Sequence, residues 1–453
     1  LRMSATPWKT RPAPMLGQHT EEVLAQAPKW TPRQISDTGI RHKPLHGVRV
    51  IDFTNAVAGP TASFILADLG AEVIKVEAPS SRPLVAGGTA PLMEGSDVPG
   101  YNRIMLFNEL NHGKRSLSLD VATAEGAALF KRLVAVSDVV VQNFSPRVMS
   151  NLGIDYETLR AIRPEIVLVS MPAFGLSGPF RDRISYGPGV DAMSGLSHLT
   201  GYSDGPPMKP GNFFCDQNAG LLASFASMAA LWHRKTSGEG QHIELAMIEG
   251  EFQVLGDAYI DYAFNGRERM RKGNEHAWMA PHEVFRCSGE DAWVAIAVES
   301  DEQFSALCGV IGRPELAQDS RFATRSARYA NRALLAEPIS AWTGGRSNLE
   351  AQDVLQAAGV PAGAALDSLE LLNNPHVLAR HGFEYVETTG VGRTPYPRVA
   401  FTLSETPVPI ERAAPGFGEA NDYVLCDLLG LSGGAVSELE ERGIVARVPS
   451  GGH

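Results

Sequence analysis

Short apolar segments alternate with helix-forming segments between residues 48 and 170. Strands are expected at 48–53, 72–77, 138–141 and 166–170, and helices at 62–70, 122–136 and 156–162. A helix placed between two neighbouring strands requires a crossover, which makes those strands parallel. The repeated unit therefore predicts an α/β fold with a parallel sheet that binds ligands at the carboxyl ends of its strands.

The pattern changes after residue 264, which indicates a second domain. A strand is expected at 292–298, and the polar stretch 320–360 is typical of surface helices. We divide the chain into a large domain of residues 45–225 and 385–453, connecting helices over 226–264, and a smaller α+β domain over 265–384.

Charge and composition exclude several classes of protein. The net charge of -11 argues against a nucleic-acid partner. The most apolar stretch, 219–232, is shorter than the roughly 20 residues that span a bilayer, so no membrane partner is expected. The four widely spaced cysteines predict neither disulfides nor a metal site, which favours the cytoplasm. Without a G-x-G-x-x-G or P-loop motif, a nicotinamide cofactor is not expected either.

The two ends of the chain resemble each other. Ser4, Thr6, Pro7, Arg11, Pro14, Gly17, Val23 and Leu24 recur in order as Ser404, Thr406, Pro407, Arg412, Pro415, Gly418, Val424 and Leu425. We interpret residues 1–25 as the tail of an upstream copy of the same module and 26–44 as a linker. The first residue is leucine, which fits a clipped chain or a longer parent protein. Chance similarity of two proline-rich tails is the alternative.

Several motifs occur in an order that resembles class III coenzyme A transferases, the family of formyl-CoA transferase, carnitine CoA-transferase and α-methylacyl-CoA racemase. The matching segments are 45–79, 111–120, 139–146, 187–201, 237–247, 271–287 and 413–419. The resemblance implies a large Rossmann-like CoA-binding domain, a small domain, and two chains interlocked as a dimer, or as a pseudo-dimer in fused two-copy members. It implies coenzyme A as co-substrate, with an acyl-CoA and a small carboxylic acid as partners and no metal.

The same resemblance places the nucleophile of the family at Asp216. A carboxylate can attack an acyl-CoA thioester to form a mixed anhydride, and the released thiolate can then form an aspartyl-CoA thioester. The alternative is a helix N-cap for the apolar segment 219–232. Racemases of this family carry a histidine before an aspartate where this chain has Val190 and Asp191, so racemisation is disfavoured. For Asp191 we expect a hydrogen bond at the sheet edge.

The CoA contacts of the family fall on scattered loops of this chain. They are Val57, Ala58, Lys114, Arg115, Leu119, Asn143, Phe144, Ser145, Arg147 and Tyr186. His276 and Trp278 are expected to line the acyl pocket. Three departures from formyl-CoA transferase, at Val57, at Ala78 and over 275–278, argue against oxalate or formate as acceptor.

Three functions follow from these residues. The first is CoA transfer between carboxylic acids through Asp216. The second is a transferase/lyase that acts on a substrate such as dimethylsulfoniopropionate, as some fused members do. The third is a non-catalytic scaffold half of a duplicated enzyme, against which the retention of Asp216 argues.

Overall fold

The computed structural model describes residues 1–7, 9–26, 42–82, 100–388 and 391–450. They form two compact units. The large unit comprises residues 1–194, 211–256 and 383–453, and the small unit comprises 195–210 and 257–382. This division differs from the expected one in placing 195–210 with the small unit. The expected linker 26–44 lies almost wholly outside the described residues.

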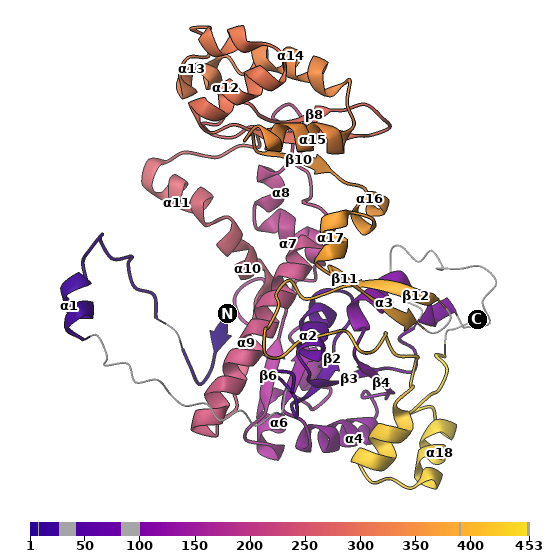
Figure 1. The fold of residues 1–453 in the computed structure, drawn as a ribbon. Coiled ribbons are helices and arrows are strands. Elements are labelled where there is room, and N and C mark those ends of the chain that lie inside the picture. The colour runs from indigo at the N-terminus through magenta and orange to yellow at the C-terminus, as the bar shows by residue number, and fades with distance from the viewer. Residues whose placement is uncertain (8, 27–41, 83–99, 389–390, 451–453) are drawn as a thin grey trace. The chain divides into compact units, whose positions relative to one another are not determined.

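The large unit is built on a seven-stranded sheet with the strand order β1-β7-β6-β5-β2-β3-β4 (Figure 1). The strands are β1 (Arg2–Met3), β2 (Arg49–Phe53), β3 (Glu72–Glu77), β4 (Arg115–Ser118), β5 (Val139–Gln142), β6 (Val167–Ser170) and β7 (His242–Glu244). Strands β2 to β7 pair in parallel, and only β1 pairs antiparallel, on the β7 edge. The prediction of an α/β fold with a parallel sheet is confirmed.

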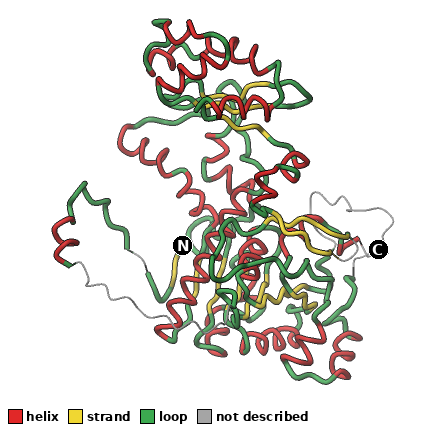
Figure 2. The backbone as a smooth tube through the Cα atoms, in the orientation of Figure 1, coloured by secondary structure: helices red, strands yellow, loops and turns green. Residues whose placement is uncertain are grey.

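Helices cover both faces of this sheet (Figure 2). They are α2 (Ala58–Asp68), α3 (Met105–Asn111), α4 (Ala124–Ala135), α5 (Val148–Asn151), α6 (Tyr156–Ile162), α7 (Gly187–Met193), α9 (Phe214–Ser237), α10 (Met247–Val254) and α18 (Gly433–Glu441). One buried cluster joins α2 and α9 to one face, and a second joins α4, α6 and the C-terminal segment to the other. The alternating side chains of β2 show this, since Val50 enters the first cluster and Ile51 the second.

Helices α2 and α9 approach closely where α9 carries Gly220. A Cβ atom at this position would lie 2.5 Å from the Cβ of Thr61 and 2.9 Å from the carbonyl oxygen of Ala58. Any side chain here would push the helices apart. The contact therefore fixes the start of α9 beside the start of α2, which positions the site described below.

The remaining elements of the large unit lie at its ends. The tail helix α1 (Thr20–Ala25) is exposed, and β11 (Phe383–Thr388) pairs with β12 (Gly392–Pro397) in a hairpin. A π-helical turn covers Tyr423–Leu428. Residues 1–6 of the expected upstream tail form the edge of the sheet: the backbone N–H of Ser4 donates to the carbonyl of His242 (3.0 Å).

The small unit holds a three-stranded antiparallel sheet with the order β10-β9-β8. Its strands are β8 (His282–Arg286), β9 (Trp293–Ala297) and β10 (Ala362–Ala365). Its helices are α8 (Leu196–Leu199), α11 (Gly256–Asn265, whose first residue belongs to the large unit), α12 (Asp301–Val310), α13 (Arg325–Ala330), α14 (Ala333–Thr343), α15 (Asn348–Ala357), α16 (Ser368–Leu372) and α17 (Pro375–Ala379). Phe285, Val294 and Leu307 are part of its own buried core. Within the described ranges of both units, no helix combines the length and the apolar character needed to cross a membrane.

Candidate active site

Asp216 lies in the first turn of α9, inside the helix rather than at its cap. The helix begins at Phe214, and the N-cap residue Phe213 has a left-handed backbone (φ 52°) and makes no side-chain capping bond. The N-cap interpretation of Asp216 is therefore wrong. The expected helix start at Ala219 was late because Phe213 carries none of the usual capping side chains.

The carboxylate of Asp216 is enclosed by backbone. Only 8% of the residue is exposed. The backbone N–H of Ala58, at the start of α2, donates a hydrogen bond to it. A Cβ atom at Gly187, the first residue of α7, would lie 1.8 Å from its Oδ2 atom, so only glycine leaves room for the carboxylate there.

The pKa of Asp216 is raised to about 6, above the ordinary aspartate value. Burial is the main cause, and the nearby carboxylate of Asp191 is the second. The hydrogen bonds from Ala58 and from its own backbone N–H act in the opposite direction, and Glu251 adds a smaller upward contribution. A helix N-terminus favours the anion, but burial and negative neighbours outweigh that effect at Asp216.

Asp216 forms part of the wall of a cavity of about 560 Å³. The cavity lies at the carboxyl ends of β2 and β3, where a parallel sheet is expected to bind ligands. It is lined by Asn55, Ala56, Val57, Pro60, Lys75, Glu77, Ser81, Arg82, Ile104, Leu106, Phe107, Asn111, Tyr186, Gly187, Pro188, Phe213 and Asp216. The expected CoA contacts Val57 and Tyr186 thus share a cavity with the expected nucleophile, and Ala58 touches that nucleophile directly.

Several lining residues were not anticipated from the sequence, Arg82 above all. The residue is 3% exposed, and its guanidinium donates two hydrogen bonds of 2.7 Å to the carboxylate of Glu77 and lies 3.7 Å from the ring centroid of Phe107. Lys75 is similarly engaged, donating to the carbonyl of Thr54 (3.1 Å). In the sequence, the one indication that Lys75 and Glu77 line the cavity is their position near the carboxyl end of β3.

A second group of expected contacts, Asn143, Phe144 and Ser145, follows the carboxyl end of β5. The side chain of Asn143 accepts from the N–H of Asn55 (2.9 Å) and donates to its carbonyl (2.7 Å), which holds the loop after β2 in place. Phe144 packs on the ring of Phe53, and Ser145 is exposed. Asn143, Phe144 and Ser145 therefore lie at the carboxyl ends of the strands, where a parallel sheet binds ligands.

Lys114 and Leu119 do not fit the expected role. Lys114 is completely buried, and its Nζ donates to Asp52 (2.8 Å), Asn111 (2.9 Å) and the carbonyl of Pro60 (3.1 Å). Burial raises the pKa of the Asp52 carboxyl, but the charges of Lys114 and Lys75 and the hydrogen bonds from Lys114 and Thr54 hold it well below its usual range. Leu119 is 1% exposed and belongs to the core. A group inside the fold cannot meet CoA phosphates, so both expectations are corrected.

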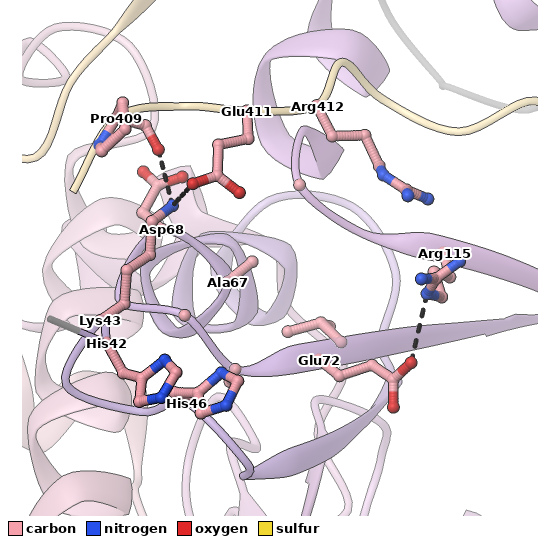
Figure 3. Close-up of a pocket in the computed structure, with 14 residues that line it drawn as sticks. His42, Lys43, His46, Ala67, Asp68, Glu72, Arg115, Pro409, Glu411 and Arg412 are labelled. Carbon is pink, nitrogen blue, oxygen red and sulfur yellow. Dashed lines mark hydrogen bonds and ion pairs between the residues drawn. The ribbon is translucent and has the colours of Figure 1, made fainter. Parts of the chain in front are cut away.

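Arg115 lies at the amino end of β4, whereas Asp216 lies near the carboxyl ends of the parallel strands. Arg115 lines a separate pocket of about 570 Å³ and bonds to Glu72 there, with 3.2 Å between Nε and Oε1 (Figure 3). Arg147, in turn, forms a bidentate and exposed ion pair with Asp182 (3.0 and 2.8 Å). Arg115 is therefore not at the predicted CoA site, and Arg147 would have to leave Asp182 to reach a phosphate.

His276 and Trp278 belong to the small unit and contact each other. Their rings meet edge to face with centroids 4.8 Å apart, and the guanidinium of Arg325 lies 4.9 Å from the Trp278 ring centroid. Trp278 is 39% exposed. An aromatic side chain with this exposure can contact an acyl chain. The expected role of His276 and Trp278 in the acyl pocket stays a prediction.

Asp191 lies in α7, beside the active-site helix, and not at a sheet edge as expected. One oxygen of Asp191, the Sγ of Cys215 and one oxygen of Glu251 all lie within 4.8 Å of one another. Burial and three surrounding carboxylates raise the pKa of the Cys215 thiol. These three side chains are the one group in the described part of the chain whose types and spacing could hold a metal ion.

Comparison with known proteins identifies the family of the chain. Residues 45–421 match the model of CoA-transferase family III. Succinate–glutarate CoA-transferase of Agrobacterium fabrum is 36% identical over 394 residues, which cover 87% of this chain and 98% of that protein. Succinyl-CoA–D-citramalate CoA-transferase of Chloroflexus aurantiacus is 33% identical over 403 residues, covering 89% and 98%.

A solved structure shares the fold. The crystal structure of a CAIB/BAIF family protein from Brucella suis aligns with a TM-score of 0.77 at 34% identity, covering 86% of this chain and all of that one. The chain therefore belongs to CoA-transferase family III. It is an enzyme that transfers CoA between acyl-CoA thioesters and carboxylic acids, which confirms the predicted family and enzyme class.

Proposed function

We propose that Asp216 is the nucleophile of this CoA transfer. The observation that carries the proposal is its position: a nearly buried carboxylate on the wall of a cavity at the carboxyl ends of β2 and β3. Burial excludes water, which would otherwise hydrolyse an activated aspartyl ester. With a pKa of about 6, the carboxylate is mostly ionised at neutral pH and still more basic than an exposed aspartate.

The reaction runs in four displacements at Asp216. Its carboxylate attacks the acyl-CoA carbonyl carbon, which forms a mixed anhydride and releases CoA thiolate. The thiolate attacks the aspartyl carbonyl of that anhydride, which releases the first acid as its carboxylate and leaves an aspartyl-CoA thioester. The second carboxylate attacks this thioester, and the thiolate finally attacks the new acyl carbonyl. Each step exchanges one acyl bond for another, so atoms and charge balance without an added reagent.

The chain's own residues enclose and position this chemistry. Ala58 donates its backbone N–H to the carboxylate, and Gly187 leaves the space that the carboxylate occupies. For coenzyme A we retain Val57, Ala58, Asn143, Phe144, Ser145 and Tyr186, because they lie at or next to the carboxyl edge of the sheet. Preorganised donors of this kind stabilise developing charge without reorganisation.

For the acids, we propose short dicarboxylates, with succinyl-CoA as donor. The names of two relatives support this choice, since both contain succinate or succinyl-CoA together with a second dicarboxylic acid. The test is an exchange assay with succinyl-CoA and a panel of free acids, including glutarate, malate, citramalate and oxalate, read by mass. The same assay run on dimethylsulfoniopropionate separates transfer from transfer followed by elimination.

We propose that the enzyme works as a pair of copies in the cytoplasm, either two identical chains or this chain with a fused upstream copy. Support for a partner comes from apolar side chains on the outer face of α9, where Trp232 is 72% exposed. Support for a reducing compartment comes from the cysteines, all four of which are free thiols.

A further inference from the structure

The wall of the cavity that holds Asp216 also carries a lysine, Lys75 of β3. Side chains alternate along a strand, so Lys75 leaves β3 on the same face as Val73, which belongs to the buried cluster around α2 and α9. Lys75 and Asp216 therefore lie on one face of the sheet. Only 4% of Lys75 is exposed, so water solvates its ammonium group poorly.

The carboxylates around Lys75 are neutralised by other cations. Asp52, its partner in the pairing of β2 with β3, accepts a hydrogen bond from Nζ of Lys114 (2.8 Å). Glu77, also on β3, accepts two hydrogen bonds of 2.7 Å from Arg82. In the part of the chain that the structure describes, the ion pair of Lys75 itself is a long one, with 3.8 Å between Nζ and Oδ1 of Asp52. The charge of Lys75 is thus in excess on this wall.

The ammonium group of Lys75 also has spare hydrogen-bonding capacity. An ammonium group has three N–H donors, and among the described residues one of them bonds to the carbonyl oxygen of Thr54 (3.1 Å). A buried charge costs free energy unless it is both paired and hydrogen-bonded. An anionic group of a molecule bound in the cavity would supply the missing partner.

We propose that Lys75 binds the terminal carboxylate of a dicarboxylic acyl group while Asp216 attacks the thioester at its other end. Lys75 attracts the terminal carboxylate and Asp216 repels it, so the two charges orient the acyl group with its thioester toward the nucleophile. Arg82 is the other cation of this wall, but Glu77 already occupies it. This inference rests on the proposed role of Asp216 and on the proposed dicarboxylates.

The test compares two donors, succinyl-CoA and butyryl-CoA. They share coenzyme A and an acyl chain of the same length, and differ in the terminal carboxylate. The readout is the initial rate of covalent adduct formation at Asp216, at low donor concentration and without an acceptor acid. Contacts to coenzyme A affect both donors alike, so the ratio of the two rates reports on the carboxylate alone.

Lys75→Met keeps most of the length of the side chain and removes its charge. We expect it to lower the ratio of the succinyl-CoA rate to the butyryl-CoA rate by about 10-fold or more, the effect of one hydrogen bond to a charged group. The matched control is Arg49→Met, which removes a cation at the amino end of β2, where Arg49 pairs with Glu72 (2.7 Å). The control should keep the wild-type ratio.

The outcomes separate this inference from the proposed function. A wild-type preference for succinyl-CoA that survives in Lys75→Met overturns the inference alone, because Lys75 then serves the fold or coenzyme A. An equal fall of the ratio in Arg49→Met overturns it too. A wild type that reacts as fast with butyryl-CoA contradicts the proposed dicarboxylates, and a wild type without any adduct contradicts the role of Asp216.

A second measurement needs no variant of Lys75 and does not depend on how Lys75→Met folds. A crystal structure of Asp216→Asn, which lacks the nucleophile, is determined with bound succinyl-CoA. We expect an oxygen of the terminal carboxylate at about 3 Å from Nζ of Lys75. A terminal carboxylate bonded to other residues and not to Lys75 overturns the proposal.

Discussion

Gly187 shows how tightly the residues around Asp216 are constrained. It opens α7 and lies against the carboxylate, where a Cβ atom would come within 1.8 Å of Oδ2. Ala58 approaches from the other helix with its backbone N–H. The position of the carboxylate is thus set by two backbones, which are stiffer than side chains, and this is the precision that a nucleophile requires.

Replacing Gly187 by alanine should therefore displace the carboxylate and slow transfer. We expect Gly187→Ala to lower kcat for CoA exchange by about 100-fold, the effect of a misplacement of about 1 Å. Gly211→Ala is the matched control, because no heavy atom lies within 4 Å of the Cβ position at Gly211. Circular dichroism should show both variants folded. Full activity of Gly187→Ala would contradict the close contact.

The burial of Asp216 also destabilises the folded protein. A carboxyl whose pKa rises from 3.8 in the unfolded chain to about 6 in the fold favours the folded state only while it is protonated. That contribution is present below about pH 4 and is lost as pH rises through about 6. At about 1.4 kcal/mol per pH unit, the ionised form costs about 3 kcal/mol at neutral pH.

We therefore expect Asp216→Asn to raise the melting temperature at pH 8 and to leave it nearly unchanged at pH 4. Thermal unfolding of wild type and variant at both pH values measures this. Asp182→Asn is the control of opposite sign, because its partner Arg147 lowers the pKa of Asp182, so the variant should gain no stability at pH 8. A gain in Asp216→Asn that is equal at both pH values would argue against the raised pKa.

The sequence identifies a site residue where its neighbours in the chain form a recognisable motif, and misses one whose partners are distant in the chain. The candidate Asp216 could be named from the sequence because neighbouring motifs mark its place, and Val57 and Tyr186 line the same cavity. Lys114 was misread because a charged residue looks alike in the sequence whether it faces solvent or pairs with Asp52 inside the fold. Glu251 carried no local signal at all, since it reaches Asp191 only through the packing of α10 on α7 and α9.

At the scale of elements, strands were easier to predict than the start of the active-site helix. Buried parallel strands such as β5 and β6 are short apolar runs that stand out from their surroundings. Helix α9 begins earlier than expected, because the left-handed Phe213 starts it without a capping side chain. The connecting helices expected over 226–264 are also interrupted by β7, whose short HIE sequence has little strand signal.

The outer face of α9 leads to a prediction about assembly. Leu221, Phe225 and Trp232 are all more than half exposed on this helix. Exposed apolar side chains gathered on one element indicate a partner surface. We expect the wild type to sediment with the mass of a dimer, and Phe225→Glu with Trp232→Glu to shift it toward the mass of one chain.

The matched control for that experiment is Val448→Glu, an exposed apolar residue elsewhere in the large unit. It introduces the same charge into a solvent-facing position outside α9. Sedimentation velocity of the three proteins at several concentrations gives the result. A wild type that stays a single copy at high concentration would contradict the proposed pair.

At the scale of the whole molecule, the large unit was predictable and its N-terminal edge was not. Repeated strand–helix–strand units define the parallel core, which the shared fold of the Brucella suis protein confirms. The added strand β1 is only Arg2–Met3 and has no pattern of its own. It is held by backbone pairing to β7 and by the bond from Thr6 to Gln241 (3.1 Å), contacts that only the folded sheet provides.

The most direct test of the central claim is chemical trapping at Asp216. The protein is incubated with succinyl-CoA, treated with hydroxylamine or borohydride, digested, and the peptide that contains Asp216 is analysed by mass. The account predicts a modification on Asp216 that requires succinyl-CoA, and loss of both the modification and CoA exchange in Asp216→Asn. CoA exchange that continues in Asp216→Asn, or exchange by the wild type with an unmodified Asp216 peptide, would contradict it.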